Sequence, residues 1–275
     1  MTVGQADLRD RLYSSAHYAV ILVLLAVALL PFIYALSVSF RPYSEIFGPV
    51  HWIPRDPTLE AWRLALEELS TPLRNSFFIA TGTAIISLVI TIPGAYVFGR
   101  KDFLGKKPLF YSIIIALLFP YILLIVPIIS IWDSLALYNT IPGLWIAYQV
   151  FVAPFALWIL RDFFEKLPAN IEEAAQVYGC TQFSAFLRVI LPLSVPAIIS
   201  VGFISFLVAW NDFLFANLLT TGSGPRPAVV TLFISTIGGE TTSWALLMSE
   251  TLLIGLPPTV LYMVSRRYLS NAFAT

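Results

Sequence analysis

Long apolar stretches are the feature that most limits what this chain can fold into. The first, Tyr18–Phe40, runs for 23 residues without a charged side chain. Five more lie at 75–98, 109–132, 141–160, 197–219 and 243–265. About 20 apolar residues in a helix cross the hydrocarbon core of a bilayer, where the backbone must satisfy its own hydrogen bonds. The sequence therefore predicts an all-α, polytopic membrane protein with six transmembrane helices.

Composition agrees with a membrane protein. Hydrophobic residues make up 58% of the 275 residues and charged residues 12%, about half the charged share of an average soluble domain. The formal net charge is zero, so no nucleic-acid partner is expected, whereas membrane lipid is. Cys180 is the only cysteine, which excludes an intrachain disulfide and argues against a cysteine metal cluster. The first apolar stretch is too long for a signal peptide, so a retained helix is predicted.

Lysine and arginine are unevenly distributed among the segments that join these stretches. If the N-terminus is cytoplasmic, eleven of them fall on the cytoplasmic side: Arg9, Arg11, Arg100, Lys101, Lys106, Lys107, Arg161, Lys166, Arg188, Arg266 and Arg267. Only four fall outside: Arg41, Arg55, Arg63 and Arg226. Because basic residues concentrate in cytoplasmic loops, both termini and the segment 162–196 are predicted to be cytoplasmic.

The segment between the fourth and fifth stretches carries helix start and stop residues. Asn170 is a good N-cap, and Glu173 three positions later completes a capping box. Gly179 stands where a helix often ends, and Thr181 can cap a second short helix that ends at Pro192 and Pro196. The apolar stripe of that second helix consists of Phe183, Phe186, Leu187 and Ile190. The pattern predicts two short helices that form a compact knob. An amphipathic hairpin that lies on the membrane without a partner is the alternative.

The residues of this knob resemble a family motif. Glu173-Ala174-Ala175, then Gly179, then Leu191-Pro192 is similar to the EAA loop of ABC importer permeases, although Val189 stands where that family more often has isoleucine. In the family this loop is the coupling helix that docks on the ATPase subunit. The resemblance assigns ATPase coupling to Glu172, Glu173, Ala174, Ala175, Gly179, Leu191 and Pro192.

Two further strings resemble carbohydrate-importing members of that family. Residues 51–66 are similar to the outer loop of sugar-importer permeases, with Trp62 in place of a tyrosine, and they include a possible surface helix, Leu59–Leu69. The string 209–216, AWNDFLFA, is similar to the W-N-D segment of the fifth core helix. Together these strings imply a sugar, an oligosaccharide or a related polyol as the solute.

The resemblance implies a type I ABC importer permease core, of the type that includes the smaller permease of the maltose system. Residues 1–275 would form one transmembrane domain, divided into a leading helix and outer loop (1–70), a five-helix core (71–267) and a tail (268–275). The implied partners are a second permease subunit, an ABC ATPase dimer that binds ATP and Mg, and an extracytoplasmic solute-binding protein. The implied location is the bacterial cytoplasmic membrane. The chain has no Walker A, HExxH or Gly-x-Ser-x-Gly motif, so no cofactor, metal site or catalytic residue of its own is expected.

Polar residues inside the apolar stretches are the candidates for the translocation pathway or its gate: Asn75, Trp210, Asn211, Asp212 and Glu250. Ionisable groups within a membrane span are costly and usually face a cavity or a protein neighbour. Three alternatives stay open. Asp212 is a structural hydrogen-bond cap that pins a kink or the partner permease. Asp212 and Glu250 drive a proton-coupled secondary transporter. Asn75 starts a helix first and contacts the solute second. An intramembrane enzyme is the least supported class, because no reactive cluster is present.

A stretch rich in Gly, Pro, Ser and Thr, Thr221–Thr242, separates the last two apolar stretches. Four glycines make a flexible loop: Gly222, Gly224, Gly238 and Gly239. By the family resemblance, this loop contacts the solute-binding protein. A plain connector is the alternative, although about twenty residues is long for one.

Overall fold

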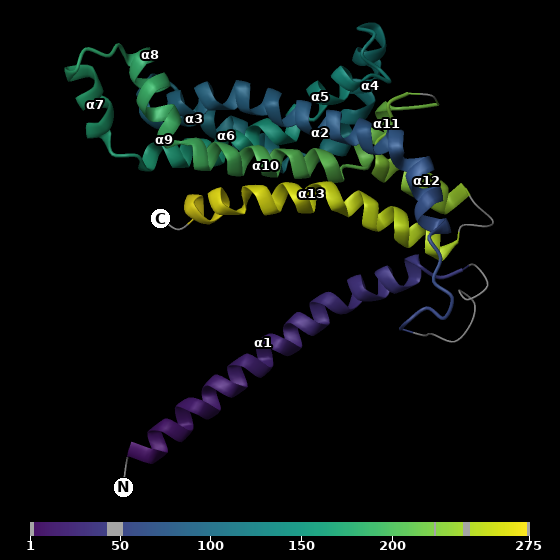
Figure 1. The fold of residues 1–275 in the computed structure, drawn as a ribbon. Coiled ribbons are helices and arrows are strands. Elements are labelled where there is room, and N and C mark those ends of the chain that lie inside the picture. Colours follow the sequence, from purple (N-terminus) through teal and green to yellow (C-terminus); the bar gives the residue numbers. More distant parts are fainter. Residues whose placement is uncertain (1–2, 43–51, 223, 239–242, 274–275) are drawn as a thin grey trace. The chain divides into compact units, whose positions relative to one another are not determined.

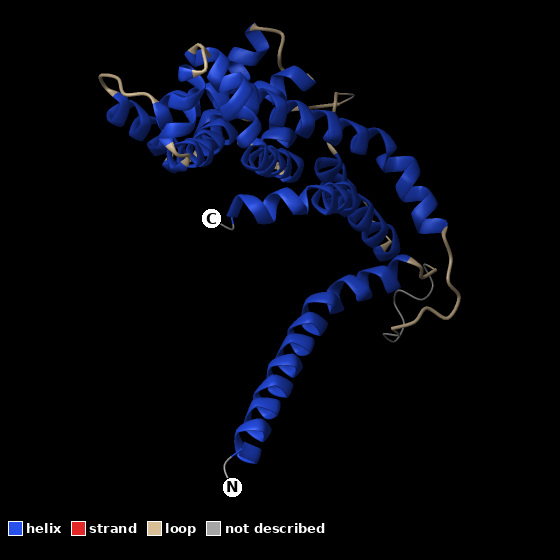
Figure 2. Ribbon diagram, turned by 60° about the vertical axis from the view of Figure 1, so that its left-hand side comes forward, coloured by secondary structure: helices blue, strands red, loops and turns tan. Residues whose placement is uncertain are grey.

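The computed structural model describes residues 3–42, 52–222, 224–238 and 243–273, and the regular structure within these ranges is all helical (Figures 1 and 2). The all-α prediction is confirmed. The α-helices are α1 Val3–Ser39, α2 Glu60–Arg100, α3 Lys106–Ile115, α4 Ile125–Ser134, α5 Ile141–Ala147, α6 Gln149–Lys166, α7 Ala169–Val177, α8 Gln182–Ala185, α9 Leu191–Leu193, α10 Val195–Asn211, α11 Leu214–Leu219, α12 Ala228–Gly238 and α13 Trp244–Phe273. Two 3₁₀ segments, η2 Ala116–Leu118 and η3 Tyr121–Leu124, join α3 to α4, and a π-turn, η4 Phe186–Ile190, joins α8 to α9.

Length and hydropathy identify up to six candidate membrane spans in the described residues. Three are single helices: Ala16–Ser39, Glu60–Arg100 and Trp244–Arg267. Three are pairs of helices bent at a short break: Lys106–Leu118 with Tyr121–Ser134 by 92°, Ile141–Ala147 with Gln149–Lys166 by 49°, and Gln182–Leu193 with Val195–Asn211 by 72°. The number agrees with the six predicted spans, but half of them are interrupted.

The interruptions have local causes in only some cases. Pro120 explains the 92° bend, since it lacks an N–H and the preceding Phe119 adopts extended backbone. At Ser194, which separates α9 from α10, Pro196 likewise removes a backbone donor. The bend at Tyr148 has no proline or glycine beside it. The fifth predicted span, 197–219, is wrong as one continuous helix, because α10 ends at Asn211 and α11 starts at Leu214.

Helix α2 corrects two predictions. Its 41 residues include both the predicted surface helix Leu59–Leu69 and the predicted second span, because nothing in between stops the helix. Pro72 and Pro93 lie inside it, as prolines can in membrane helices. Asn75 is therefore a mid-helix residue, and the interpretation that it starts a helix is wrong.

Helix α12 corrects a third prediction. The stretch 221–242 is not an irregular loop throughout, since Ala228–Gly238 is helical. The sequence AVVTLFISTI within it is apolar enough to form a buried helix, but the flanking glycines, prolines and serines dominate the composition.

The chain divides into two compact units. Unit 1 comprises Met1–Glu68 and Ser235–Leu253, and unit 2 comprises Leu69–Ile234 and Ile254–Thr275, so the boundary passes through α2, α12 and α13. In unit 1, most apolar side chains in the membrane-span part of α1 are exposed, and Val38 near its end is buried, as expected of a helix that faces lipid or another subunit. Its C-terminal end is held where Trp62 Nε1 donates to Ser39 Oγ at 3.2 Å.

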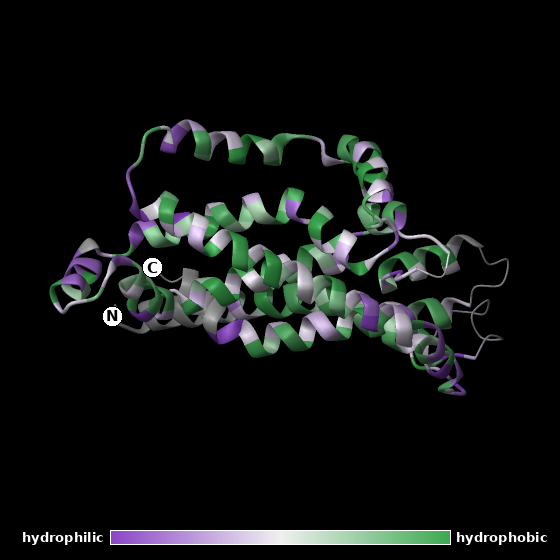
Figure 3. Ribbon diagram, turned by 90° about the horizontal axis from the view of Figure 1, so that it is seen from above, coloured by the Kyte–Doolittle hydropathy of each residue, from purple (hydrophilic) through white to green (hydrophobic). Residues whose placement is uncertain are grey.

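The core of unit 2 lies where α2, α6, η4 and α10 pack together, next to α3 (Figure 1). Alanine, aliphatic and aromatic side chains make up this core: Ala95, Tyr96, Phe98, Ala156, Leu157, Leu160, Phe164, Phe186, Ile190, Ala197 and Val201. The helices α7 and α8 project from one end of this bundle, and hydrophilic residues gather there (Figure 3). This core fixes the base of that projection.

Candidate functional site

The knob formed by α7 and α8 begins differently from the predicted capping box. Pro168 is the N-cap of α7, with φ −57°, and Asn170 is an exposed residue inside the helix. Proline presets the backbone for a helix start, so the capping-box prediction is wrong. The predicted end is present, because Gly179 directly after the α7 C-cap has φ +90°, a conformation that glycine adopts without cost. Thr181 caps α8 by accepting a hydrogen bond from Ser184 N at 3.2 Å.

The apolar stripe of the second helix divides into two sets. Phe186 and Ile190 are buried in the core of unit 2, whereas Phe183 and Leu187 are 70% and 42% exposed. The π-turn between them adds a residue to the helical turn and so rotates the following side chains. The four residues predicted to form one apolar face therefore point in two directions in the structure, two into the core and two outward.

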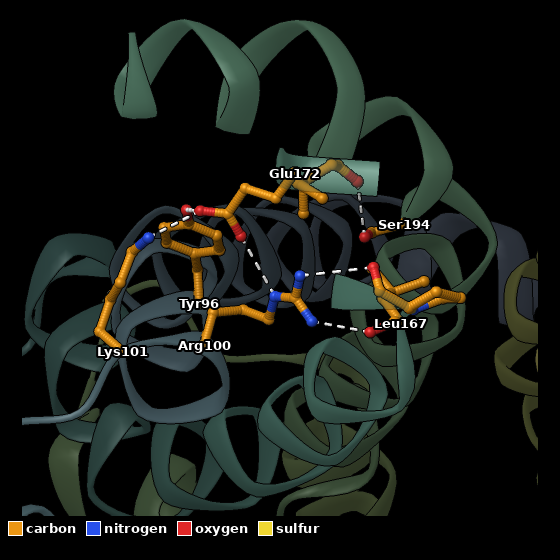
Figure 4. Close-up of polar contacts among 8 residues, drawn as sticks. Tyr96, Arg100, Lys101, Leu167, Glu172 and Ser194 are labelled. Carbon is orange, nitrogen blue, oxygen red and sulfur yellow. Dashed lines mark hydrogen bonds and ion pairs between the residues drawn. The ribbon is translucent and has the colours of Figure 1, made fainter. Parts of the chain in front are cut away.

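Glu172 fastens α7 to the C-terminal end of α2, and Figure 4 shows the arrangement. Its Oε1 accepts hydrogen bonds from Tyr96 OH at 2.6 Å and from Lys101 Nζ at 2.6 Å. Its Oε2 accepts from Arg100 Nε at 3.2 Å. Arg100 also donates from Nη1 to Leu167 O at 2.7 Å, in the turn that leads into α7. The carboxylate is buried, with its side chain 8% exposed, so this is an ion-pair hub rather than a surface contact.

The electrostatics of this hub favour the ionised forms of Glu172 and Lys101. Burial alone would raise the pKa of Glu172, but the hydrogen bonds from Lys101 and Tyr96 and the positive charge of Lys101 outweigh it and lower that pKa. Burial would lower the pKa of Lys101, but the Glu172 and Tyr96 hydrogen bonds raise it. A buried carboxylate with several charge-assisted donors is among the strongest polar contacts a protein makes.

The rest of the α7 motif faces outward. Glu173 and Ala174 are exposed, Ala175 is half-buried, and Val177 and Tyr178 are 85% and 89% exposed. We call the exposed set Glu173, Ala174, Val177, Tyr178 and Phe183 the distal surface. Val177 and Tyr178 thus place two apolar side chains in exposed positions at the tip of a polar loop. Near the next span, Leu191 is half-buried and Pro192 is exposed.

Tyr96, Arg100 and Lys101 are the residues that sequence reasoning missed. Arg100 and Lys101 counted only toward membrane orientation, and Tyr96 lies in a predicted span. The one available indication was the pair of basic residues directly after an apolar stretch, on the same predicted side as an acidic motif.

Asp212 lies at the break between α10 and α11. Its backbone is extended, with ψ 126°, and its Oδ2 accepts hydrogen bonds from Ala216 N at 3.0 Å and from Tyr148 OH at 3.0 Å. This is the geometry of a cap at the start of α11, as the structural alternative describes. Trp210 is buried and stacked on Phe206 with ring centroids 5.4 Å apart, while Asn211 is exposed.

The other predicted pathway residues lie elsewhere. Glu250 is fully buried in unit 1, beside the carboxylate of Glu68. Asn75 Nδ2 donates to Arg226 O at 3.1 Å, and the neighbouring Ser76 Oγ accepts from Ala228 N at 2.8 Å. These two side chains hold the start of α12 against α2.

The predicted loop glycines lie on both sides of α12. Gly222, with φ +55°, and Gly224 precede it, and Gly238 is its last residue. Gly239 lies outside the described residues. The start of this stretch is docked, since Asn139 Oδ1 accepts from Thr221 N at 2.9 Å.

Comparison with known proteins identifies the family. Residues 91–274 match the model of the binding-protein-dependent transport system inner membrane component. The chain belongs to this family. It is therefore a multi-pass membrane protein of the ABC transporter permease type, as the EAA loop resemblance implied.

Individual relatives cover most of the chain. It is 32% identical over 246 residues to a sulfoquinovosyl glycerol transport system permease protein from Agrobacterium fabrum, covering 88% of this chain and 85% of the relative. It is 33% identical over 207 residues to a trehalose transport system permease protein from Mycobacterium tuberculosis, covering 74% and 75%. It is 30% identical over 246 residues to a probable ABC transporter permease protein from Pyrococcus horikoshii, covering 87% and 88%.

Solved structures share the fold. A bacterial ABC transporter involved in the import of the acidic polysaccharide alginate matches with a TM-score of 0.79 at 19% identity, covering 95% of this chain and 98% of that one. An alginate ABC transporter in complex with a periplasmic protein bound to an alginate pentasaccharide matches with a TM-score of 0.70 at 13% identity, covering 97% and 96%. The chain thus has the type I ABC importer permease fold.

Proposed function

We propose that this chain is a permease subunit of an ATP-driven, binding-protein-dependent importer that carries a carbohydrate across the bacterial cytoplasmic membrane. The names of its relatives, which transport trehalose or sulfoquinovosyl glycerol, support the solute class. ATP and Mg would be bound by a partner ATPase dimer. A second permease subunit and an extracytoplasmic solute-binding protein would complete the complex.

The observation that carries the proposal is the way in which α7 is attached to α2. Its inward face is fixed to α2 by the buried Glu172 hub, and its distal surface is free and partly apolar. A loop that transmits force between two proteins needs a rigid base and an exposed contact face. An amphipathic hairpin that only lies on lipid has no need of a buried ion-pair base, so the geometry favours coupling to an ATPase.

Membrane orientation supports the same proposal. The C-terminal part of α13 and the α7 projection lie toward the same end of unit 2 (Figures 1 and 3). The basic residues predict that both are cytoplasmic, which is where ATP is available. The stretch 221–242, with Gly222, Gly224, Gly238 and Gly239, would then lie outside and contact the solute-binding protein.

The coupling role can be tested at Glu173, whose side chain is exposed on the distal surface. Glu173→Lys leaves the Glu172 hub intact, so the chain is expected to insert and assemble normally. Uptake should fall at least tenfold, because a cation replaces an acid near a helix N-terminus and within the contact face. The control is Glu67→Lys, an exposed acid on α2 in unit 1, which should keep wild-type uptake. Normal uptake by Glu173→Lys would contradict the coupling assignment.

The rival function, a proton-coupled secondary transporter that uses Asp212 and Glu250, makes a different prediction. Uptake would then survive ATP depletion and stop with an uncoupler. The proposed importer shows the opposite pattern in proteoliposomes with ATP supplied on the ATPase side. Family membership favours the importer.

A further inference from the structure

We propose that this chain itself holds part of the transported solute, in a subsite for one neutral sugar ring formed by Tyr121, Phe151, Asn211 and Asp212. The inference rests on the proposed carbohydrate function and goes beyond it, since the solute could instead be held entirely by the binding protein and the other permease. It is carried by a cavity in unit 2, by the groups that line it and by the charge they present.

The cavity lies where two interrupted helices meet. It has a volume of about 450 Å³ and is lined by Tyr121, Phe151, Val208, Asn211, Asp212, Phe213 and Leu214. Tyr121 comes from the 92° bend between α3 and α4, and Asp212 from the break between α10 and α11. Within a bilayer, irregular backbone is stable only where protein or a water-filled cavity surrounds it. Transporters place their solute sites at such discontinuous helices.

One wall of the cavity is aromatic and rigidly supported. The rings of Tyr121 and Phe151 lie 5.5 Å apart. Phe215, which is buried, packs against both, at 5.8 Å from Tyr121 and 5.4 Å from Phe151. Tyr148 packs on Phe151 from the protein side at 5.6 Å. The electron-rich face of an aromatic ring attracts the C–H bonds on the apolar face of a pyranose, and this wall offers such faces without any rearrangement.

The facing polar groups suit sugar hydroxyls. Asn211 is exposed, and its Nδ2 donates to Leu207 O at 2.9 Å, which fixes the amide while its carbonyl oxygen keeps two acceptor positions. Asp212 is half-buried, and Tyr148 OH and Ala216 N fix its orientation. Fixed amide and carboxylate oxygens beside an apolar wall are the usual composition of a small-molecule site.

The charge of the cavity selects among sugars. Asp212 is acidic, and none of the described residues that line the cavity is lysine, arginine or histidine. A uronate or sulfonate sugar would place a second negative charge beside Asp212 without a cation to compensate it. The subsite therefore fits a neutral sugar, whatever charge the relatives' solutes carry.

The test uses the complete transporter in proteoliposomes with its binding protein and ATP, and trehalose, diacetylchitobiose and an alginate trisaccharide as probes. Tyr121→Ala and Asn211→Ala should each reduce uptake of a neutral probe about tenfold, the loss of one good contact. Complex yield should stay at wild-type level. The matched controls are Tyr121→Phe, which keeps the ring, and Asn217→Ala, an asparagine of α11 that does not line the cavity; both should transport normally.

A second measurement separates binding from folding. Cys180 is the only cysteine, so a Cys180→Ser background allows a single cysteine at position 211 or 217. The transported neutral sugar should slow maleimide labelling of Asn211→Cys several-fold and leave Asn217→Cys unchanged.

The outcomes differ for the two proposals. Wild-type import of a neutral probe with unaffected Tyr121→Ala and Asn211→Ala variants overturns the subsite and leaves the carbohydrate function standing. Import of the alginate trisaccharide alone overturns its neutrality. Variants with reduced yield but normal uptake per complex indicate that lipid or the second permease fills the cavity, which also overturns it. A wild-type complex that imports no probe contradicts the carbohydrate function and the subsite together.

Discussion

Two buried or half-buried carboxylates in unit 2, Glu172 and Asp212, fix the chain at breaks between helices in opposite ways. Glu172 is held by two cations and a phenol, from the last two turns of α2 and the residue directly after it. Asp212 is held by the neutral hydroxyl of Tyr148 and by the backbone N–H of Ala216. The first carboxylate is compensated in charge, whereas the second is only hydrogen-bonded.

This difference corresponds to what each region is proposed to do. If a buried ion pair loses one partner, the other charge is left buried and uncompensated, which is costly. The contacts of Glu172 with Arg100 and Lys101 therefore hold α7 rigidly on α2, and we call them the stiff joint. A carboxylate with neutral donors can change its environment without leaving a cation behind, so it can sit beside a passing solute. The stiff joint at Glu172 lies beneath the distal surface, and Asp212 lines the cavity.

The largest effect is expected when the stiff joint is broken. Glu172→Ala leaves Arg100 and Lys101 without their acid and should cost about 3–5 kcal/mol in the docking of α7. Amide hydrogen exchange of residues 169–177 in the assembled complex measures this cost directly. Glu173→Ala, at the exposed neighbouring position, is the control and should change exchange by less than tenfold. Equal effects of the two variants would remove the distinction between anchored and free faces.

Acidic pH should weaken the contacts of Glu172 with Arg100 and Lys101, whereas changes of pH around neutrality should leave these contacts unchanged. The pKa of Glu172 is lowered from its ordinary value, so its contribution is complete above that value and is lost as pH falls through the lowered one. The pKa of Lys101 is raised, so its contribution is complete at neutral pH and is lost only at strongly basic pH. An environment-sensitive dye on Cys180 should report constant emission from about pH 6 to 9 and a change below about pH 4. Glu172→Gln should abolish that acid transition; its persistence would assign the transition to other carboxylates.

A smaller loss of stability is expected at Asp212, whose hydrogen-bond donors are neutral. Tyr148→Phe removes one donor to Asp212 and should reduce the stability of the purified protein by about 1.5–3 kcal/mol, the usual value for a hydrogen bond to a charged group. Thermal unfolding in detergent measures it. Tyr178→Phe removes a hydroxyl from a side chain that is 89% exposed and should leave the unfolding temperature unchanged.

The smallest structural effect is expected from Asp212→Asn. An amide oxygen still accepts from Tyr148 and from Ala216 N–H, and no cation is stranded, so assembly should change by less than about 1 kcal/mol. Uptake should nevertheless fall, because the cavity loses its charge. Complex yield and uptake at two pH values separate the possibilities: failed assembly would make Asp212 a purely structural cap, and loss of only the pH dependence would favour a proton relay.

Sequence reasoning succeeded where the determinants are close together in the chain. The end of the first helix of the knob was predicted because a glycine at that local position favours a helix stop, and the positive φ of Gly179 agrees with it. The partners of Glu172 were not predicted, since Tyr96 and Arg100 lie 76 and 72 residues away and meet it only through packing of α2 on the loop. The bend at Tyr148 was not predicted either, because no proline or glycine adjoins it. Helix α12 was missed because composition was averaged over a stretch whose two ends differ from its middle.

The unbroken course of α2 has a mechanical consequence. Its C-terminal end is fixed to α7 through Arg100, and Ser76, near the middle of the helix, holds the start of α12. At 1.5 Å per residue these two points are about 36 Å apart, more than the thickness of the hydrocarbon core. The part of the helix between these two points therefore acts as a lever arm, with Pro93 nearer its C-terminal end. A tilt of about ten degrees displaces one point relative to the other by about 6 Å, twice the length of a hydrogen bond. Either α12 travels with α2 during such a tilt, or the Ser76 contact opens on every cycle.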